Sequence, residues 1–305
     1  MLNGNQSHSS SGAVGDQRGK VRNVCPVQDR ELIFDGGELF NGGLRVVEGI
    51  AHVVNVTPAN VEEGDVFTIL YGGIAIATFT ATAATVKNVV EGLQAAWEAN
   101  KASHPGPDAI TATEDDTKVI LTADEAGVPF TVTTSAVDGG GNDTQTLTAA
   151  VGANNDTGNV TTDPTHILGK TSIEFDKIDG SNGKKNAGVE RSDLKLDLSR
   201  FTANDIIEGY IYISDKTDVA KVIVRLGTDA TNYNQWELSD GDITQATWQQ
   251  FKKALSACVV TVGGNGWDPS DVQYAAVMVE FDAQDDTLAD MFLDHLMVRS
   301  VSPAS

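Results

Sequence analysis

The chain has 305 residues with 43 acidic and 21 basic side chains, which give a formal net charge of −22. A body this acidic repels phosphate groups, so direct binding to nucleic acid or to an anionic membrane is not expected. Aromatic residues make up only 6% of the sequence while glycine is abundant, which favours short strands joined by turns. We predict a mainly β fold with one α+β domain.

Residues 1–48 are predicted to form an extended N-terminal arm. The stretch "SHSSSGAVGDQRGK" is polar and cannot bury enough apolar surface to fold alone. The second half of the segment nevertheless contains apolar residues, among them Ile33, Phe34, Leu39 and Phe40. These four residues are predicted to dock the arm onto a partner surface, and a disordered tail is the alternative.

Residues 49–151 are predicted to form a small α+β domain. Two apolar stretches rich in β-branched residues flank Gly72 and Gly73, a pattern that is typical of a β-hairpin. The next apolar residues recur at helical spacing and predict an amphipathic helix that ends at "SHPGPD": Val86, Val89, Val90, Leu93 and Trp97. Three more strands are predicted in "KVILTA", "PFTVTTSAV" and "TQTLTAAV". Trp97 is therefore expected in the core of this domain.

Residues 152–168 are polar and rich in turn-forming residues, so they are predicted to be a linker. Residues 169–305 contain seven or more short strand-like runs, several of which alternate apolar and polar residues. This spacing favours an antiparallel β-sandwich. The predicted strands lie in "TSIEFDKI", "LKLDLS", "IIEGYIYIS", "AKVIVRLG", "NQWELS", "VQYAAVMVEF" and "MFLDHLMVRSV", and "TWQQFKKALSACVV" lies between them.

The sequence contains no phosphate-binding loop, no zinc-protease motif and no nucleophile elbow, and its five histidines are scattered. Without an identifiable nucleophile and base we predict no enzymatic activity and no organic cofactor. Cys25 and Cys258 have no metal-binding spacing, and whether either forms a disulfide is left open. The N-terminal "MLNGNQSHSSSG" lacks a signal-peptide pattern, so synthesis in the cytoplasm is expected.

The stretch "VRLGTDATNYNQWELS" raises the question of a sugar-binding loop. Trp236 and Leu238 share one face of the expected strand and are predicted to enter the core, as is Trp248. Exposed aromatic rings beside amides are the groups that bind sugars. The candidate glycan-binding residues are Asn232, Tyr233, Asn234 and Trp267.

Turn-borne carboxylates suggest a structural calcium ion, because this hard cation prefers several oxygen ligands. Asp176 and Asp179 in "DKIDGSNG" are candidate ligands, and solvated turn carboxylates are the alternative.

Residues 171–301 resemble the jelly-roll sandwiches of carbohydrate-binding modules and laminin-G-like domains. The resemblance is carried by "SIEFDKIDG", "LDLSRFTANDIIEGYIYISD", "VRLGTDATNYNQWEL", "TWQQFKKAL" and "MFLDHLMV". It implies a jelly-roll fold. It also implies that Asp294, in the last strand, helps to hold a structural calcium ion.

The middle domain is similar to small domains of tailed-bacteriophage structural proteins. The similarity is carried by "DVFTILYGGIAIATFTA", "TVKNVVEGLQAAWEAN" and "AITATEDDTKVILTADEAGVPFTVTTS". It implies a non-enzymatic virion protein on the outer surface of the particle. Such a protein would decorate or cement the capsid by binding the major capsid protein, as a homo-oligomer such as a trimer. A neck, tail or fibre-attachment protein and a glycan-binding adhesion module are the alternatives.

Overall fold

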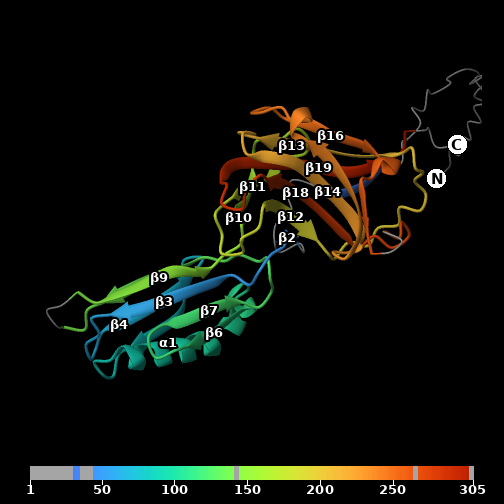
Figure 1. The fold of residues 1–305 in the computed structure, drawn as a ribbon. Coiled ribbons are helices and arrows are strands. Elements are labelled where there is room, and N and C mark those ends of the chain that lie inside the picture. Colours follow the sequence, from blue (N-terminus) through green and yellow to red (C-terminus); the bar gives the residue numbers. More distant parts are fainter. Residues whose placement is uncertain (1–29, 35–43, 141–143, 264–266, 302–305) are drawn as a thin grey trace, which may run out of the picture.

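The computed structural model describes residues 30–34, 44–140, 144–263 and 267–301 (Figure 1). The chain forms an elongated α+β domain and a larger β-sandwich, and it is mainly β, as predicted. Figure 1 shows the two parts joined end to end. No helix among the described residues is long and apolar enough to cross a bilayer.

The α+β domain contains two antiparallel sheets and one helix. The first sheet has the order β6-β7-β3-β9 and the second has the order β5-β4-β8. Their bounds are β3 (Val53–Ala59), β4 (Val66–Tyr71), β5 (Ile74–Thr80), β6 (Ile110–Glu114), β7 (Val119–Ala123), β8 (Val132–Val137) and β9 (Thr146–Ala153). The strands β4 and β5 form the predicted hairpin, and Gly72 and Gly73 both have positive φ at its turn.

Helix α1 (Val86–Asn100) lies along one side of the domain and packs on both sheets (Figure 1). The Thr85 hydroxyl oxygen accepts a hydrogen bond from the Asn88 N–H and caps the first turn. The helix buries a stripe of four residues at the predicted spacing: Val89, Val90, Leu93 and Trp97. The Trp97 indole N–H donates to the Ile110 carbonyl at 3.2 Å, so the predicted core position of Trp97 is confirmed. Two 3₁₀ turns follow, η2 (Lys101–Ser103) and η3 (Pro107–Ala109).

The sandwich consists of two six-stranded antiparallel sheets, which we call sheet A and sheet B. Sheet A has the order β10-β11-β19-β13-β16, with β1 also paired to β19; sheet B has the order β17-β15-β14-β18-β12-β2. The strands of sheet A are β1 (Arg30–Phe34), β10 (Thr157–Asp163), β11 (Ser172–Lys177), β13 (Ile206–Ile213), β16 (Gln249–Ala254) and β19 (Leu288–Arg299). Those of sheet B are β2 (Leu44–Val46), β12 (Asn186–Arg191), β14 (Val219–Asp229), β15 (Asn232–Ser239), β17 (Val260–Val262) and β18 (Tyr274–Phe281).

Alternate residues of each sheet fill the space between the two layers. Phe175 and Ile211 come from sheet A, and Val224, Trp236 and Val277 come from sheet B; all five are at most 1% exposed. The period-2 alternation of strands places every second side chain in this core. Of the predicted strands, "LKLDLS" forms only an isolated bridge between Leu196 and Val272. Two 3₁₀ turns, η4 (Asp240–Asp242) and η5 (Leu255–Ala257), connect the sheets' strands.

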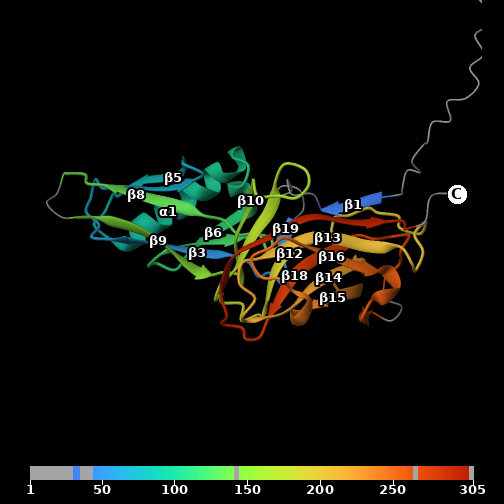
Figure 2. The same ribbon diagram turned by 90° about the horizontal axis from the view of Figure 1, so that it is seen from above.

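The second half of the predicted arm is partly built into the sandwich. Figure 2 shows β1 beside β19, at the end of the sandwich away from the α+β domain. Ile33 is 2% exposed and belongs to the sandwich core, so it is not available to dock on a partner while β1 is paired. Phe34 ends the same strand, whereas Leu39 and Phe40 lie outside the described residues. Strand β2 is likewise paired, with β12, and Leu44 is fully buried.

The predicted linker 152–168 also contains a strand of the sandwich. Strand β10 pairs along β11, and Asp156 and Thr157 at its start are 2% and 3% exposed. The sequence of β10 is polar because it is an edge strand: Asn159 and Thr161 are exposed, and Val160 alone of its residues is a large apolar residue packed against the core. The polar composition of residues 152–168 therefore predicts a linker where the structure has strand β10.

We expect Ile33→Ala to lower the free energy of unfolding by about 2–5 kcal/mol, because it empties a buried aliphatic site in the core. Leu32→Ala, on the same strand but 45% exposed, is the matched control and is expected to change it by at most about 0.5 kcal/mol. Chemical denaturation of the full chain measures both. Equal, small effects of the two substitutions would mean that β1 does not belong to the stable sandwich.

Candidate functional site

The four predicted glycan-binding residues do not share one surface. The Tyr233 ring is half-buried on the outer face of sheet B, where the Arg225 guanidinium lies 4.6 Å from its centroid and Tyr274 lies 6.3 Å away. The Asn232 side-chain amide donates to the Asp229 carboxylate at 2.8 Å. Contacts within the chain thus cover part of the Tyr233 ring and engage the Asn232 amide.

Asn234 and Trp267 lie on a different side of the sheet and line a pocket of about 320 Å³. The Trp267 ring packs edge-on against Trp236, with 5.8 Å between centroids, and it is half-buried. Asn234 accepts a hydrogen bond from the Thr261 hydroxyl at 3.1 Å. Because successive residues of a strand point to opposite faces, Tyr233 and Asn234 cannot serve one flat sugar platform.

Trp236 is fully buried, as the alternation of its strand predicted. Its indole N–H donates to the carbonyls of Ala254 at 3.0 Å and Leu255 at 3.2 Å. These contacts link β15 of sheet B to the end of β16 in sheet A. The stretch "VRLGTDATNYNQWELS", which suggested a sugar-binding loop, therefore mainly contributes packing between the two sheets of the sandwich.

A different set of aromatic residues lies on the outer face of sheet A. The ring centroids of Tyr212 and Phe292 are 5.4 Å apart, those of Tyr212 and Trp248 are 5.9 Å apart, and those of Trp248 and Phe292 are 6.1 Å apart. We call these three side chains the aromatic row. Tyr212 and Trp248 are half-buried, and Phe292 is 9% exposed.

The strand register explains how the aromatic row forms. Tyr212 of β13 pairs with Phe292 of β19, and Phe292 in turn pairs with Glu174 of β11. Ile211 and Ile213, the neighbours of Tyr212, are buried in the core, so Tyr212 must point outward. The three ring centroids therefore form a triangle on the outer face of sheet A, and Glu174 of β11 is the strand partner of Phe292.

The prediction that Trp248 enters the core is corrected by this arrangement. Trp248 immediately precedes β16 and packs on the outer face, against Tyr212 and Phe292. Phe251 of β16 is 2% exposed and lies in the sandwich core, so period-2 alternation places Trp248, three positions earlier, on the opposite face. The alternation in "IIEGYIYIS" could have identified Tyr212 as an outward-facing aromatic residue, and the sequence reasoning did not use it.

The carboxylate of Glu174 is electrostatically crowded. Burial and the nearby charges of Asp163, Asp176 and Asp290 raise the pKa of Glu174 above its ordinary value. Carboxylate oxygens accept hydrogen bonds from hydroxyl groups, while tyrosine and tryptophan rings pack on apolar C–H faces. The outer face of sheet A thus combines the two kinds of contact that a neutral sugar needs.

The predicted calcium ligands are not brought together as a set. Asp176 accepts hydrogen bonds from the Asn159 amide at 2.5 Å and from the Asp290 backbone N–H at 2.9 Å. Asp294 is 1% exposed and accepts the backbone N–H groups of Ile167 and Leu168, both at 2.7 Å. Asp179 is exposed. Hydrogen bonds from the chain thus occupy two of the three carboxylates.

Across the described ranges, one group of three carboxylates lies close enough to share a metal ion: Glu91, Glu114 and Asp116. The group is on the surface of the α+β domain, and the Lys87 ammonium lies 2.6 Å from Asp116 and 3.6 Å from Glu91. A lysine already neutralises part of this charge, so the group is explained as a surface ion-pair cluster.

No protein-family model and no curated protein sequence matches this chain. Solved structures align with about half of it. An exo-β-agarase aligns with 11% identity and a TM-score of 0.35 over 49% of this chain and 23% of the agarase, so the match spans less than a quarter of that enzyme. A family 30 carbohydrate-binding module aligns with 16% identity and a TM-score of 0.35, over 48% of this chain and 76% of the module. The family 30 module of a cellulosomal cellulase from Clostridium thermocellum aligns with 14% identity and a TM-score of 0.34, over 50% of this chain and 90% of the module.

Proposed function

We propose that this chain is a non-catalytic binding protein whose sandwich holds a polysaccharide on the outer face of sheet A. The observation that carries the proposal is the aromatic row, in which Tyr212 and Trp248 remain partly exposed beside one another. Two adjacent rings provide a surface for the C–H face of a sugar, and Glu174 lies one strand beyond Phe292 to accept hydroxyl hydrogen bonds.

A polysaccharide-binding experiment on the whole chain tests this role. We expect Tyr212→Ala and Trp248→Ala each to weaken binding to the preferred polysaccharide by about tenfold or more, which corresponds to about 1.4 kcal/mol per ring. Affinity electrophoresis against a panel of neutral and acidic polysaccharides identifies the ligand, and calorimetry measures the loss.

Tyr233→Ala is the matched control, because it removes a half-buried tyrosine from the opposite sheet. The proposal expects this variant to bind as well as the original chain. If Tyr233→Ala abolishes binding while Trp248→Ala does not, the loop predicted from the sequence is the sugar site. If the unaltered chain binds no polysaccharide in the panel, the proposal is wrong.

We also propose that the chain is displayed on the outer surface of a bacteriophage virion, bound to the major capsid protein or to another virion protein. The order of elements in the α+β domain supports this location. The hairpin β4–β5, helix α1 and strands β6–β8 follow one another in the same order as the sequence segments that resemble phage structural domains. Such a protein brings a polysaccharide-binding sandwich to the particle surface. Assembly as a trimer and a structural calcium ion in the sandwich belong to the same proposal.

Antibodies against the sandwich, applied to purified particles and viewed by electron microscopy, test the location. Label distributed over the shell is the expected result. Label confined to the neck or tail would make the chain an adaptor or fibre-attachment protein, and absence from the particles would contradict a virion role.

A further inference from the structure

The pocket that Asn234 and Trp267 line in the sandwich has mainly apolar walls. Its volume is about 320 Å³, and Phe201, Leu255 and Trp267 are among the residues around it. Phe201 and Trp267 pack against the sandwich core but are only half-buried. Within the described part of the chain, no charged residue lines this pocket, although the chain as a whole has a net charge of −22. The pocket therefore favours an apolar occupant over an ion.

The pocket lies close to the point where strand β1 begins. The Arg200 Nη2 atom is 3.5 Å from the Arg30 carbonyl oxygen. The guanidinium carbon of the same arginine lies 4.9 Å from the centroid of the Phe201 ring. Because a single guanidinium group bridges these two contacts, the Arg30 carbonyl oxygen is within about 10 Å of a ring that lines the pocket.

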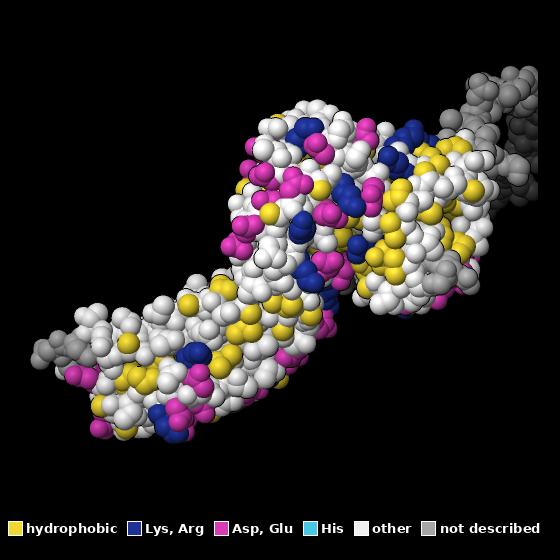
Figure 3. Space-filling view, in the orientation of Figure 1, with side chains coloured by type: hydrophobic (Ala, Val, Ile, Leu, Met, Phe, Trp, Pro, Cys, Tyr) yellow, Lys and Arg dark blue, Asp and Glu magenta, His cyan; other side chains and the backbone are white. Residues whose placement is uncertain are grey.

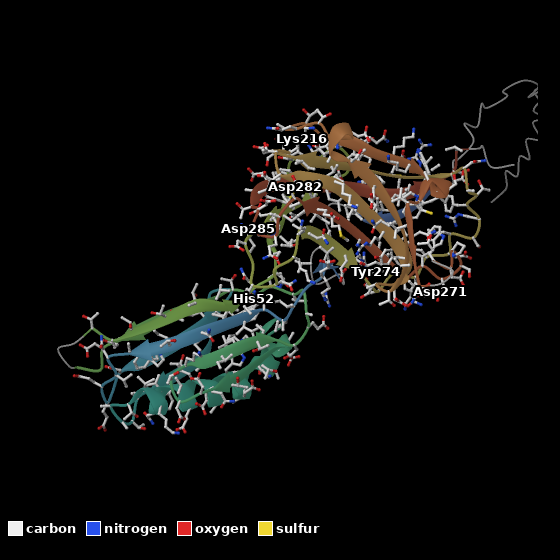
Figure 4. The ribbon with its side chains drawn as sticks, in the orientation of Figure 1. His52, Lys216, Asp271, Tyr274, Asp282 and Asp285 are labelled. Carbon is white, nitrogen blue, oxygen red and sulfur yellow. The ribbon has the colours of Figure 1, made fainter. Side chains whose placement is uncertain are left out.

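Both features lie at the end of the sandwich away from the α+β domain. Figure 2 shows β1 at this end. Figure 4 shows Asp271 at the same end, and Pro269 of the pocket wall lies two residues before it in the sequence. Hydrophobic side chains also gather on the visible surface of this end (Figure 3). An apolar pocket thus lies near the point at which the chain enters β1.

The residues just before β1 have a sequence that suits such a pocket. Residues 21–29 read "VRNVCPVQD", so residues 24–27 contain no charged side chain. Pro26 has no backbone N–H, and it favours an extended conformation of the residue before it. An extended chain spans about 3.3–3.6 Å per residue, so the six steps from Val24 to Arg30 reach about 20 Å. This reach exceeds the distance from the start of β1 to the pocket wall.

We propose that residues 24–27 of this chain occupy the pocket, with their two valines packed against Phe201 and Trp267. Because the segment is covalently joined to β1, its effective concentration at the pocket is on the order of millimolar, so weak apolar contacts suffice to hold it. The half-buried Trp267 ring is then covered by the chain itself and not by a glycan. Residues 1–23 leave the sandwich at the end away from the α+β domain. The contact involves no residue of the aromatic row, so it is independent of the proposed polysaccharide face.

The reactivity of Cys258 tests the proposal, because its half-buried thiol lies in the pocket wall. The sequence contains two cysteines, so Cys25→Ser leaves Cys258 as the one thiol of the full chain. In this background, we expect Val24→Asn, Val27→Asn to accelerate the alkylation of Cys258 by iodoacetamide about tenfold, because a polar segment no longer covers the pocket. Mass spectrometry of samples quenched at successive times measures the rate.

Ala13→Asn, Val14→Asn in the same background is the matched control, since it also replaces two apolar residues by asparagine but lies outside residues 24–27. It is expected to leave the alkylation rate unchanged. The protection of Cys258 is also expected to be independent of protein concentration, because the segment belongs to the same chain.

The proposal is overturned if Val24→Asn, Val27→Asn leaves the alkylation rate of Cys258 unchanged. It is also overturned if the control variant accelerates alkylation as much. Protection that rises with protein concentration would assign the pocket to a segment of a second copy, which contradicts occupancy by the chain's own residues.

Discussion

Asp156→Ala is expected to lower the free energy of unfolding by about 3–5 kcal/mol, because it leaves an unpaired charge inside the protein. The Asp156 side chain is 2% exposed and that of Lys177 is fully buried, with 3.3 Å between the carboxylate and the ammonium. The carboxylate also accepts the backbone N–H groups of Gly180 at 3.3 Å and Lys184 at 3.0 Å. Removing the carboxylate leaves the ammonium without a counter-charge and two backbone N–H groups without this acceptor.

The ammonium of Lys177 is not left without contacts, since it donates to the carbonyls of Ile178 at 3.0 Å and Gln284 at 2.7 Å. Those carbonyls are neutral and cannot balance its charge. The double variant Asp156→Ala, Lys177→Met carries no buried charge at this position and is therefore expected to be more stable than Asp156→Ala alone. Urea denaturation of both variants measures the difference.

Asp179→Ala is the control for the loss of a carboxylate charge without the loss of a buried ion pair. Asp179 lies two residues after Lys177, the last residue of β11, but it is exposed. We expect it to change the free energy of unfolding by at most about 0.5 kcal/mol. If Asp156→Ala is no more destabilising than this control, water reaches the ion pair and the start of β10 is not a buried part of the sandwich.

Trp236→Ala is expected to cost about 3–5 kcal/mol of stability, as do other truncations of large buried aromatic residues. The residue is fully buried between the sheets, and its indole N–H is shared by the carbonyls of Ala254 and Leu255. Truncation opens a cavity in the sandwich and leaves both carbonyls without this donor. Thermal unfolding followed by near-ultraviolet circular dichroism measures the effect.

Tyr233→Ala, three residues earlier on the same strand, provides the comparison. Its ring is half-buried on the outer face, so its removal is expected to cost clearly less than the removal of Trp236. A larger loss of stability with Tyr233→Ala would mean that contacts on the outer face of sheet B stabilise β15 more than the contacts of Trp236 between the two sheets.

Sequence patterns identified the elements whose signal is local. Helix α1 was predicted with its buried stripe, since its apolar residues recur within fifteen neighbouring positions of one helix. The hairpin of β4 and β5 was predicted for the same reason, because glycines with positive φ are needed at its turn. The burial of Trp236 followed from the alternation of a single strand.

Elements that depend on distant partners were missed or misplaced. Strand β1 pairs with residues near 297 and β2 pairs with residues near 190, so nothing within residues 1–48 shows that these segments are strands of the sandwich. Strand β10 has a polar sequence that is typical of a linker. It is a strand because it pairs with β11 at the edge of sheet A.

The sequence by itself determined that this chain is mainly β and where its helix lies. It also determined that Trp97 of α1 and Trp236 of β15 are buried. Periodicity within one segment is enough for these predictions, because it shows which side of that segment avoids water. Only the tertiary structure decided the candidate sites. Tyr212, Trp248 and Phe292 come from separate parts of the chain and meet through the register of β13 and β19 and the packing of Trp248 beside them. Proximity of this kind arises from strand pairing and packing over long sequence distances, which no local pattern encodes.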